Sequence, residues 1–153
     1  MAISNNEIKK VKSLQQKKFR DEYGLFIAEG EKMVKEAMSS GFCVEKVYYK
    51  SEIGDEAMGR ISSLSSPSPA LAVVRKPSDV FIEDPAALQD MSGAGGLYLA
   101  LDGIRDPGNL GTILRIADWF GLDAVFAAKD TVDVFNPKVV QATMGAVFRV
   151  KMH

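Results

Sequence analysis

Residues 97–121 read LYLALDGIRDPGNLGTILRIADWFG, an apolar run that passes through a short polar loop into an amphipathic segment. The run LYLALDGI is continuous, as expected of a strand that is buried on both faces of a sheet. The loop combines a charge pair, a rigid turn and an amide in Arg105, Asp106, Pro107, Gly108 and Asn109. We expect Asn109 to cap a helix over residues 110–120. The stretch therefore predicts the strand, loop and helix that begin a parallel α/β sheet.

Downstream of this stretch the same alternation continues. DAVFAA (123–128) is typical of another buried strand, and NPKVVQATMGAVF (136–148) is typical of a second helix. Asn136 is the expected cap of that helix, with Pro137 in its first position. RVKMH (149–153) begins a third strand. The β-α-β-α-β order predicts part of a doubly wound parallel sheet, which carries helices on both faces.

Residues 1–76 show a separate alternation of helices and strands. ISNNEIKKVKSLQQKKFRDEYG (3–24) predicts one helix that Ser4 or Asn5 caps and Gly24 ends. Short apolar runs predict three strands, LFIAEG (25–30), CVEKVYY (43–49) and ALAVVRKP (70–77). Helical spacing occurs between them, in EKMVKEAMSSG (31–41) and more weakly in DEAMGRISSL (55–64). This pattern predicts a small α/β unit that is distinct from the unit over residues 97–153.

Residues 77–96, PSDVFIEDPAALQDMSGAGG, differ from both units in composition. Prolines, glycines, small residues and acids are typical of a connection between domains. We expect this connection to make few contacts of its own, although VFI (80–82) has the composition of a short strand. The predicted organisation is therefore a unit over residues 1–76, a linker over 77–96 and a second unit over 97–153.

Charge is distributed unevenly along the chain. The whole chain of 153 residues has a net charge of -1, so its overall charge identifies no partner. Residues 1–20, by contrast, hold six basic residues against the single acid Glu7. A basic arm on an otherwise acidic protein favours a polyanion as partner, although a solvated lysine-rich helix face explains it equally well. The candidate RNA-binding residues are Lys9, Lys12, Lys17, Lys18 and Arg20.

Composition excludes several classes of protein and site. The only cysteine is Cys43 and the only histidine is His153, the last residue. An internal disulfide is therefore impossible, and a catalytic triad with a histidine base or a Cys/His zinc site is not expected. Motifs for dinucleotide or nucleotide phosphates are missing from the sequence. The sequence has neither a membrane-length apolar run nor a signal peptide, so we expect a cytoplasmic protein. Because Cys and His are so few, we expect no metal.

The helix over residues 110–120 predicts a candidate site. On a helical wheel one broad arc is expected to bury against the sheet, and it holds Leu110, Ile113, Leu114, Ile116, Ala117 and Phe120. The opposite arc holds Gly111, Arg115, Asp118 and Trp119. Ligands of parallel sheets bind beyond the carboxyl ends of the strands, where this loop lies. The simpler interpretation is that Asn109 is only a cap and Arg115 only a surface residue. Trp119 has two candidate roles, a cation–π partner of Arg115 or a contact with a partner subunit.

The quoted stretch closely resembles the first motif of the SpoU (TrmH-like) RNA 2′-O-ribose methyltransferases, which belong to the knotted SPOUT superfamily. The similarity continues through NPKVVQATMGAVFRV (136–150). KKFRDEYGLFIAEGEKMVKEAM (17–38) and SPALAVVRKP (68–77) look like the start and end of that family's substrate-binding domain, a small ribosomal-protein-like α/β module. The resemblance covers nearly the whole chain, and its first motif is the more specific part.

The resemblance implies a reaction and places its residues. It implies transfer of a methyl group from S-adenosylmethionine to a ribose 2′-hydroxyl of rRNA or tRNA, by a protein that is a homodimer. The motif asparagine falls on Asn109 and the motif arginine on Arg115. Because a guanidinium is a poor base, we expect Arg115 to orient a phosphate and stabilise an alkoxide rather than remove the proton.

The sequence also departs from the family pattern. The family's second and third motifs follow the third strand and form the knot and most of the cofactor pocket, and no residue follows His153 here. We therefore expect the knot region to be absent, S-adenosylmethionine to bind weakly or not at all, and the 153-residue chain itself to be inactive. Cofactor-binding residues are expected mostly beyond His153. The alternative is a structured-RNA-binding module that catalyses nothing.

Overall fold

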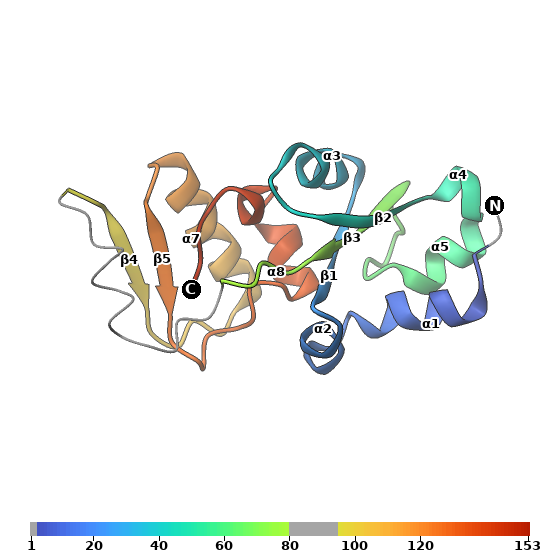
Figure 1. The fold of residues 1–153 in the computed structure, drawn as a ribbon, viewed down its shortest axis with the longest axis horizontal. Coiled ribbons are helices and arrows are strands. Elements are labelled where there is room, and N and C mark those ends of the chain that lie inside the picture. The colour runs from blue at the N-terminus through green and yellow to red at the C-terminus, as the bar shows by residue number, and fades with distance from the viewer. Residues whose placement is uncertain (1–2, 80–94) are drawn as a thin grey trace.

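The computed structural model describes residues 3–79 and 95–153 and has the mixed α/β architecture that the sequence predicts. A three-stranded antiparallel sheet has the order β1-β3-β2. Its strands are β1 (Leu25–Glu29), β2 (Val44–Tyr49) and β3 (Ala70–Arg75). A two-stranded parallel sheet, formed by β4 (Tyr98–Leu101) and β5 (Ala124–Ala127), lies at one end of the elongated molecule, and the antiparallel sheet lies nearer its middle (Figure 1).

Helices pack beside both sheets (Figure 1). The first unit contains α1 (Asn5–Ser13), α2 (Lys17–Tyr23), α3 (Glu31–Ser39), α4 (Lys50–Ile53) and α5 (Asp55–Ile61). The second contains α7 (Pro107–Trp119), α8 (Pro137–Ala142) and the short 3-10 helix η1 (Ala146–Phe148). In Figure 1, α8 lies between α7 and the antiparallel sheet, so it is the helix that joins the two units.

The single helix expected over residues 3–24 is wrong, because the chain breaks it into α1 and α2. Ser4 caps α1 as predicted, accepting a hydrogen bond from the Glu7 backbone N–H (3.2 Å), and Gly24 ends α2 in the left-handed region with φ 62°. Between the helices, Leu14 is 1% exposed and its carbonyl accepts a hydrogen bond from Arg20. The Arg20 side chain thus donates to the Leu14 and Gln15 carbonyls at the break, and the Leu14 side chain is buried there.

The antiparallel sheet is covered on both faces by different parts of the chain. Successive strand residues point to opposite faces, so each strand contributes to two cores. Leu25, Ile27, Leu71 and Val73 pack with apolar residues of α1 and α5. Phe26, Ala28, Ala72 and Val74 point the other way, into a core that α3, α7 and α8 complete.

The second unit confirms the predicted β-α-β-α-β order. Residues 151–153 run parallel to β5, with a bridge between Val125 and Met152 and a hydrogen bond from His153 N to Val125 O (2.9 Å). The helix expected over residues 136–148 is correct at its start, where Asn136 caps and Pro137 takes the first position. It ends early because Met144 and Gly145 have φ of 50° and 99°, outside the helical range.

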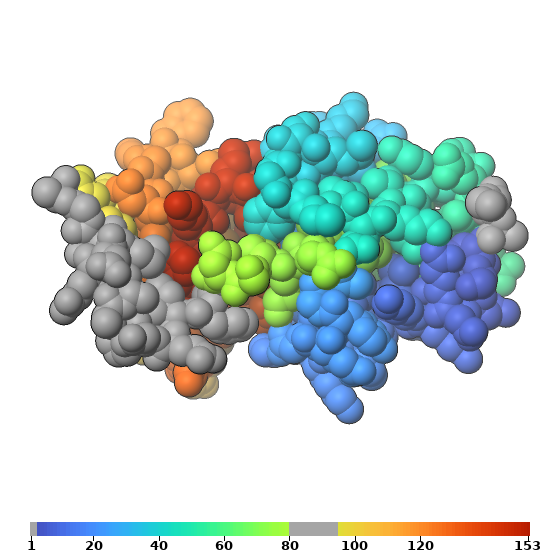
Figure 2. Space-filling model, in the orientation of Figure 1, coloured from blue at the N-terminus to red at the C-terminus, as the bar shows by residue number. Residues whose placement is uncertain are grey.

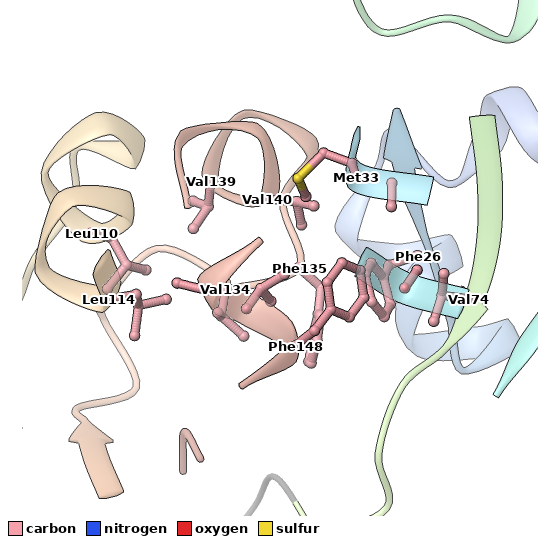
Figure 3. Packing of buried hydrophobic residues seen from close by; sticks show 14 of the residues in the cluster. Phe26, Met33, Val74, Leu110, Leu114, Val134, Phe135, Val139, Val140 and Phe148 are labelled. Atoms are coloured by element: carbon pink, nitrogen blue, oxygen red, sulfur yellow. The ribbon is translucent and has the colours of Figure 1, made fainter. Parts of the chain in front are cut away.

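The two units share one hydrophobic core. Phe26 of β1 packs against Phe135 and Phe148 of the second unit, with ring centroids 4.7 and 6.2 Å apart, as Figure 3 shows. Phe42 adds an edge-to-face contact with Phe148 at 5.3 Å. On the face drawn in Figure 2 the C-terminal residues lie against those that follow β3, with His153 Nδ1 3.0 Å from the Asp79 carbonyl oxygen. The predicted linker over residues 77–96 lies largely outside the described residues, as does the strand expected at 80–82.

Candidate active site

The loop after β4 begins α7 differently from the sequence prediction. Asp106, not Asn109, is the cap: its carboxylate accepts a hydrogen bond from the Asn109 backbone N–H (2.7 Å), and Pro107 occupies the first helical position. A carboxylate at this place also interacts favourably with the positive end of the helix dipole. The expectation that Asn109 caps the helix is therefore wrong. Asn109 lies inside the first turn, with its residue exposed to solvent.

Two loops meet at the carboxyl ends of the parallel strands. Residues 102–106 follow β4 and residues 128–133 follow β5, and backbone hydrogen bonds join them. Ala128 N donates to Leu101 O (2.9 Å), and Val132 N donates to Ile104 O (2.8 Å). This edge is where open α/β sheets bind ligands, so the predicted position of the site agrees with the fold.

Charge and backbone geometry hold the first of these loops against the second. Arg105 Nη2 lies 3.7 Å from Asp130 Oδ2, so the arginine pairs across the loops rather than with its neighbour Asp106. Gly103 has φ 63°, and a Cβ there would lie 3.1 Å from the same carboxylate oxygen. A side chain at position 103 would therefore be strained and would crowd Asp130.

Helix α7 is rotated from the orientation that the helical wheel predicts. Leu110, Leu114 and Ala117 are buried as expected. Gly111, assigned to the polar arc, is instead buried against α8, where an added Cβ would lie 2.3 Å from Ala142 Cβ. The cause is the close crossing of the two helices, which a glycine permits. Ile116 and Phe120, assigned to the buried arc, are 50% and 69% exposed.

Arg115 projects from the uncovered side of α7. It lines a shallow groove of about 520 Å³ with residues that include Thr112, Ile116 and Met144. Across residues 3–79 and 95–153, no hydrogen bond or ion pair involves the Arg115 side chain, and Trp119 does not stack on it. The guanidinium is therefore available to an anionic ligand.

The structure does not bring Asn109 and Arg115 to one point. Six residues along an α-helix correspond to about 9 Å of rise and to directions about 120° apart. Each side chain is exposed, Asn109 near the loop edge and Arg115 in the groove. Their catalytic roles stay a prediction, and within α7 each would contact a different part of a ligand.

Four of the five predicted RNA-binding residues lie on the surface. Lys9 and Lys12 are exposed on α1, and Lys17 and Lys18 on α2. Lys17 pairs with Asp21 at 2.5 Å. Burial raises the pKa of the Asp21 carboxyl, but hydrogen bonds from Lys17 and Lys76 outweigh this, so its pKa lies below the usual value. Lys17 is thus partly neutralised within the fold.

The prediction that Arg20 binds RNA is wrong. Its residue is 1% exposed, and its guanidinium donates to Asp133 of the second unit and to the carbonyls of Leu14 and Gln15. A run of basic residues in the sequence does not show which of them is buried at a helix break. RNA cannot reach this guanidinium while the fold is intact.

The sequence analysis assigned no role to three aspartates that hold the site together: Asp106, Asp130 and Asp133. For Asp106 a signal was present, since Asp followed by Pro before an apolar helical pattern is a typical helix start. The partners of Asp130 and Asp133 come from distant segments of the chain, so local sequence contains no comparable signal for them.

Two family domains match this chain. Residues 5–77 match the MRM3-like substrate binding domain, and residues 96–153 match the SpoU rRNA Methylase family. None of the helices in the described part of the chain combines the length and apolar character needed to span a membrane.

Similar proteins have names that agree with these matches. The 23S rRNA (guanosine(2553)-2'-O)-methyltransferase RlmP of Bacillus subtilis is 29% identical over 97% of this chain and 62% of its own length. The mitochondrial rRNA methyltransferase 3 of Homo sapiens is 31% identical over 86% of this chain and 35% of its own. The chain therefore spans less than two thirds of the curated relatives it matches.

Solved structures show the same fold. The AdoMet bound rRNA methyltransferase from Sinorhizobium meliloti superposes with a TM-score of 0.85 at 30% identity, over 99% of this chain and 63% of that protein. A putative RNA methyltransferase of the TrmH family from Porphyromonas gingivalis gives 0.81 at 35% identity, over 98% and 62%. The loop and helix at residues 102–119, the parallel strands around them and these similarities lead to one conclusion: the chain carries an MRM3-like substrate binding domain over residues 5–77 and a SpoU rRNA methylase domain over residues 96–153.

Proposed function

We propose that the protein to which this chain belongs transfers a methyl group from S-adenosylmethionine to a ribose 2′-hydroxyl of rRNA or tRNA. The observation that carries the proposal is α7: a SpoU-type helix at the carboxyl edge of a parallel sheet, with Asn109 and Arg115 exposed. Relatives named as rRNA 2'-O-methyltransferases support the choice of reaction.

The described residues fit one wall of a cofactor site. A cleft of about 330 Å³ lies beside the end of β5 and is lined by Ala127, Thr131 and Met152, among others. The buried Thr131 hydroxyl and His153 Nε2 have no hydrogen-bond partner among the described residues, so polar atoms are available there. The volume of the cleft is at the small end of the range for ligand pockets. S-adenosylmethionine, when bound, supplies the reactive methyl group.

The residues of this chain would position and polarise the RNA. Arg115 would bind a phosphate beside the target ribose and stabilise the negative charge that develops on the 2′-oxygen, because its guanidinium remains protonated. Asn109 would hydrogen bond to the ribose or its neighbouring phosphate from the first turn of α7. Neither side chain is occupied by an ion pair in the described structure.

Lysines of the first unit would hold the RNA. Lys9, Lys12 and Lys18 are exposed on α1 and α2, close in sequence and on neighbouring helices. Phosphate contacts release counterions, so we expect RNA affinity to fall steeply as salt increases. Reversing the charge of Lys9, Lys12 and Lys18 together is expected to abolish most of this affinity, whereas Lys32→Glu on α3 serves as the control.

We also propose that the protein is a homodimer that uses the uncovered side of α7. Trp119 is 84% exposed, Phe120 69% and Met144 66%, and they border the Arg115 groove. Contiguous exposed apolar side chains of this size are typical of a protein interface. Analytical ultracentrifugation of the wild type and Trp119→Glu tests this: the variant is expected to shift toward monomer.

We also propose that the protein works in a reducing compartment such as the cytoplasm, because the sequence holds a single cysteine.

Methyl incorporation tests the proposed reaction. The chain extended to the length of its relatives is incubated with rRNA and radiolabelled S-adenosylmethionine, and the product is hydrolysed with alkali. A methyl group on the 2′-oxygen removes the nucleophile that cleaves the adjacent phosphodiester, so the label is expected in alkali-resistant dinucleotides. Label recovered in single nucleotides would place the methyl group on a base and contradict the proposal.

A second candidate function is RNA binding without catalysis. It is favoured by one observation, that the exposed lysines lie on the first unit while Asn109 and Arg115 point in different directions on α7. Under this alternative the extended protein binds rRNA with the expected salt dependence but incorporates no label.

A further inference from the structure

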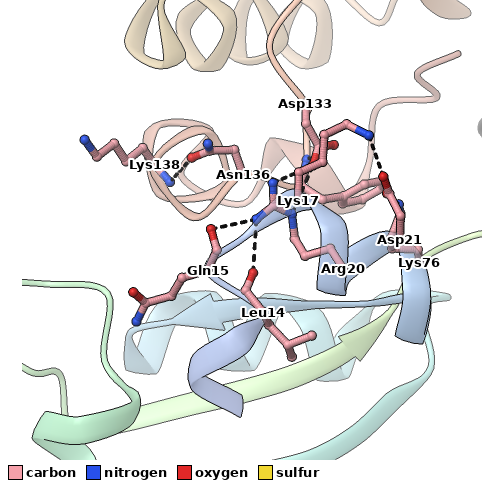
Figure 4. Close-up of polar contacts among 10 residues, drawn as sticks. Leu14, Gln15, Lys17, Arg20, Asp21, Lys76, Asp133, Asn136 and Lys138 are labelled. Carbon is pink, nitrogen blue, oxygen red and sulfur yellow. Dashed lines mark hydrogen bonds and ion pairs between the residues drawn. The ribbon is translucent and has the colours of Figure 1, made fainter. Parts of the chain in front are cut away.

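Arg20 is an unusually well-bonded residue of the first unit. Its side chain is 2% exposed, and all three guanidinium nitrogens donate hydrogen bonds. Nε and Nη2 donate to Asp133 Oδ2 at 3.0 and 2.8 Å, while Nη1 donates to the carbonyls of Leu14 and Gln15. Figure 4 shows the guanidinium between the break that separates α1 from α2 and the loop that precedes α8.

Asp133 transmits this contact into the second unit. While Oδ2 binds Arg20, Oδ1 accepts a hydrogen bond from Phe135 N (3.1 Å), and the Asp133 carbonyl accepts one from Asn136 N (3.0 Å). Asn136 is the cap of α8. The carboxylate therefore joins the first unit to the turn that starts α8.

Helix α8 in turn sets the place of α7. The helices cross with Gly111 against Ala142, so closely that a Cβ on residue 111 would overlap the alanine. A shift of the α8 start relative to the first unit would therefore move α7, and with it Asn109 and Arg115. The route from Arg20 to the candidate site consists of packed elements throughout.

Stability alone is a poor reason for this arrangement. A buried ion pair loses solvation on both partners, and replacing it with apolar side chains of similar size is often neutral or stabilising. The aromatic cluster of Phe26, Phe135 and Phe148 already holds the units together without directional bonds. What the guanidinium adds is direction, because its rigid plane aims two donors at one oxygen of the carboxylate and a third nitrogen at the carbonyls of Leu14 and Gln15.

We propose that Arg20 is a positioning residue that, through Asp133, fixes the orientation of the RNA-binding unit relative to α7. The role of this orientation rests on the proposed function: RNA held by the lysines of α1 and α2 must present its ribose at α7. Arg20 contacts neither RNA nor cofactor, and its effect on methyl transfer is indirect.

The chain contains a natural pair of probes for this orientation. Trp119, the only tryptophan, is exposed on α7 in the second unit, and Cys43, the only cysteine, is exposed in the first. Energy transfer from Trp119 to a dye on Cys43 measures the relation between the units without RNA or cofactor. We compare the wild type with the double variant Arg20→Met/Asp133→Leu, which removes both charges and leaves neither unpaired.

The double variant is expected to unfold cooperatively and to show a changed or broadened energy-transfer distribution. Arg60→Met, which loses an exposed contact to Asn5 within the first unit, is the control and is expected to match the wild type. If the double variant does not fold, Asp133→Asn keeps the shape and an acceptor oxygen, and Arg20→Lys keeps the charge without the fork. Both variants are expected to change the energy-transfer distribution, and Arg20→Lys is expected to change it less. An unchanged distribution in every folded variant would overturn the proposal.

Methyl transfer in the chain extended to the length of its relatives gives the second readout. Since a misplacement of about 1 Å can cost roughly 100-fold in rate, the double variant is expected to lose about tenfold to 100-fold in kcat, with a smaller change in RNA affinity. Equal kcat in the double variant and wild type would contradict the proposal. Absence of methyl transfer in the wild type would instead contradict the proposed function, while the energy-transfer result would still decide whether Arg20 sets the orientation.

Discussion

Strand β1 and helix α7 both carry apolar side chains on two sides, but only β1 is covered on both. Leu25 and Ile27 enter one core and Phe26 and Ala28 the other, and all four are buried. On α7 one side is buried, whereas Ile116, Trp119 and Phe120 are at least half exposed. An apolar pattern therefore shows that a surface is to be covered, but it does not show which part of the chain, or which partner, covers it.

The largest expected difference between these regions is in stability. Phe26→Ala removes a ring at the centre of the contact between the units and is expected to lower the free energy of unfolding by about 3–5 kcal/mol. Trp119→Ala removes a larger but exposed ring and is expected to change the stability of a monomeric sample by less than about 0.5 kcal/mol. Urea denaturation measures both, and similar losses would show that α7 is covered in the isolated chain.

Two arginines link the units, and substitution of the buried one is expected to cost more stability than substitution of the exposed one. Arg20→Met leaves the partly buried Asp133 carboxylate without its partner, and loss of one partner of a buried pair typically costs about 3 kcal/mol. Arg149 joins Glu36 of α3 to Asp118 of α7, but its side chain is 43% exposed. Arg149→Met is expected to cost less than about 1 kcal/mol. A larger loss from Arg149→Met than from Arg20→Met in thermal unfolding would reverse the roles assigned to the two links.

Capping provides a smaller test within α7. Asp106→Ala removes the carboxylate that accepts from the Asn109 backbone N–H, and loss of a cap typically costs about 1 kcal/mol. Asn109→Ala keeps that backbone donor and is expected to change stability by less than about 0.5 kcal/mol. Chemical denaturation of both variants distinguishes the two residues. A larger loss of stability from Asn109→Ala than from Asp106→Ala would show that Asn109 is the cap.

The smallest expected effect is on acid stability. Hydrogen bonds from Lys46 and then Tyr48 place the pKa of Glu7 below its ordinary value of 4.5 in the folded protein. A lowered folded-state pKa contributes stability above the unfolded value, and the contribution disappears as the pH falls through the folded value. Glu7→Gln is therefore expected to lower the free energy of unfolding by about 0.5 kcal/mol at neutral pH. Below pH 4.5 the free energy of unfolding of this variant should fall less steeply with pH than that of the wild type. An unchanged acid profile would contradict this assignment.

Local sequence predicts elements well where the deciding interactions are local. The strands β1, β4 and β5 and the start of α8 agree with apolar runs and with the Asn136–Pro137 start signal. The position of the site also follows from local order, because the loop after β4 must lie at the carboxyl edge of a parallel sheet.

Features that depend on distant contacts could not be predicted in this way. At the break between α1 and α2, Arg20 turns inward to Asp133, 113 residues away along the chain. The rotation of α7 depends on Gly111 meeting Ala142. In both cases a residue that the sequence pattern assigns to the surface is buried by another element. The exposure of Lys9 and Lys12 agrees with the sequence, and their role in RNA binding stays a prediction.

The central claim is that Arg115, on the uncovered side of α7, serves chemistry rather than folding, and its substitution tests this most directly. In the chain extended to the length of its relatives, Arg115→Ala is expected to slow methyl transfer to RNA by roughly 100-fold or more. Its melting temperature should stay close to that of the wild type, because the side chain is exposed and makes no ion pair among the described residues. Arg60→Ala, an exposed arginine on α5, should change neither quantity. A large fall in melting temperature with normal methyl transfer would contradict the claim and make Arg115 a structural residue.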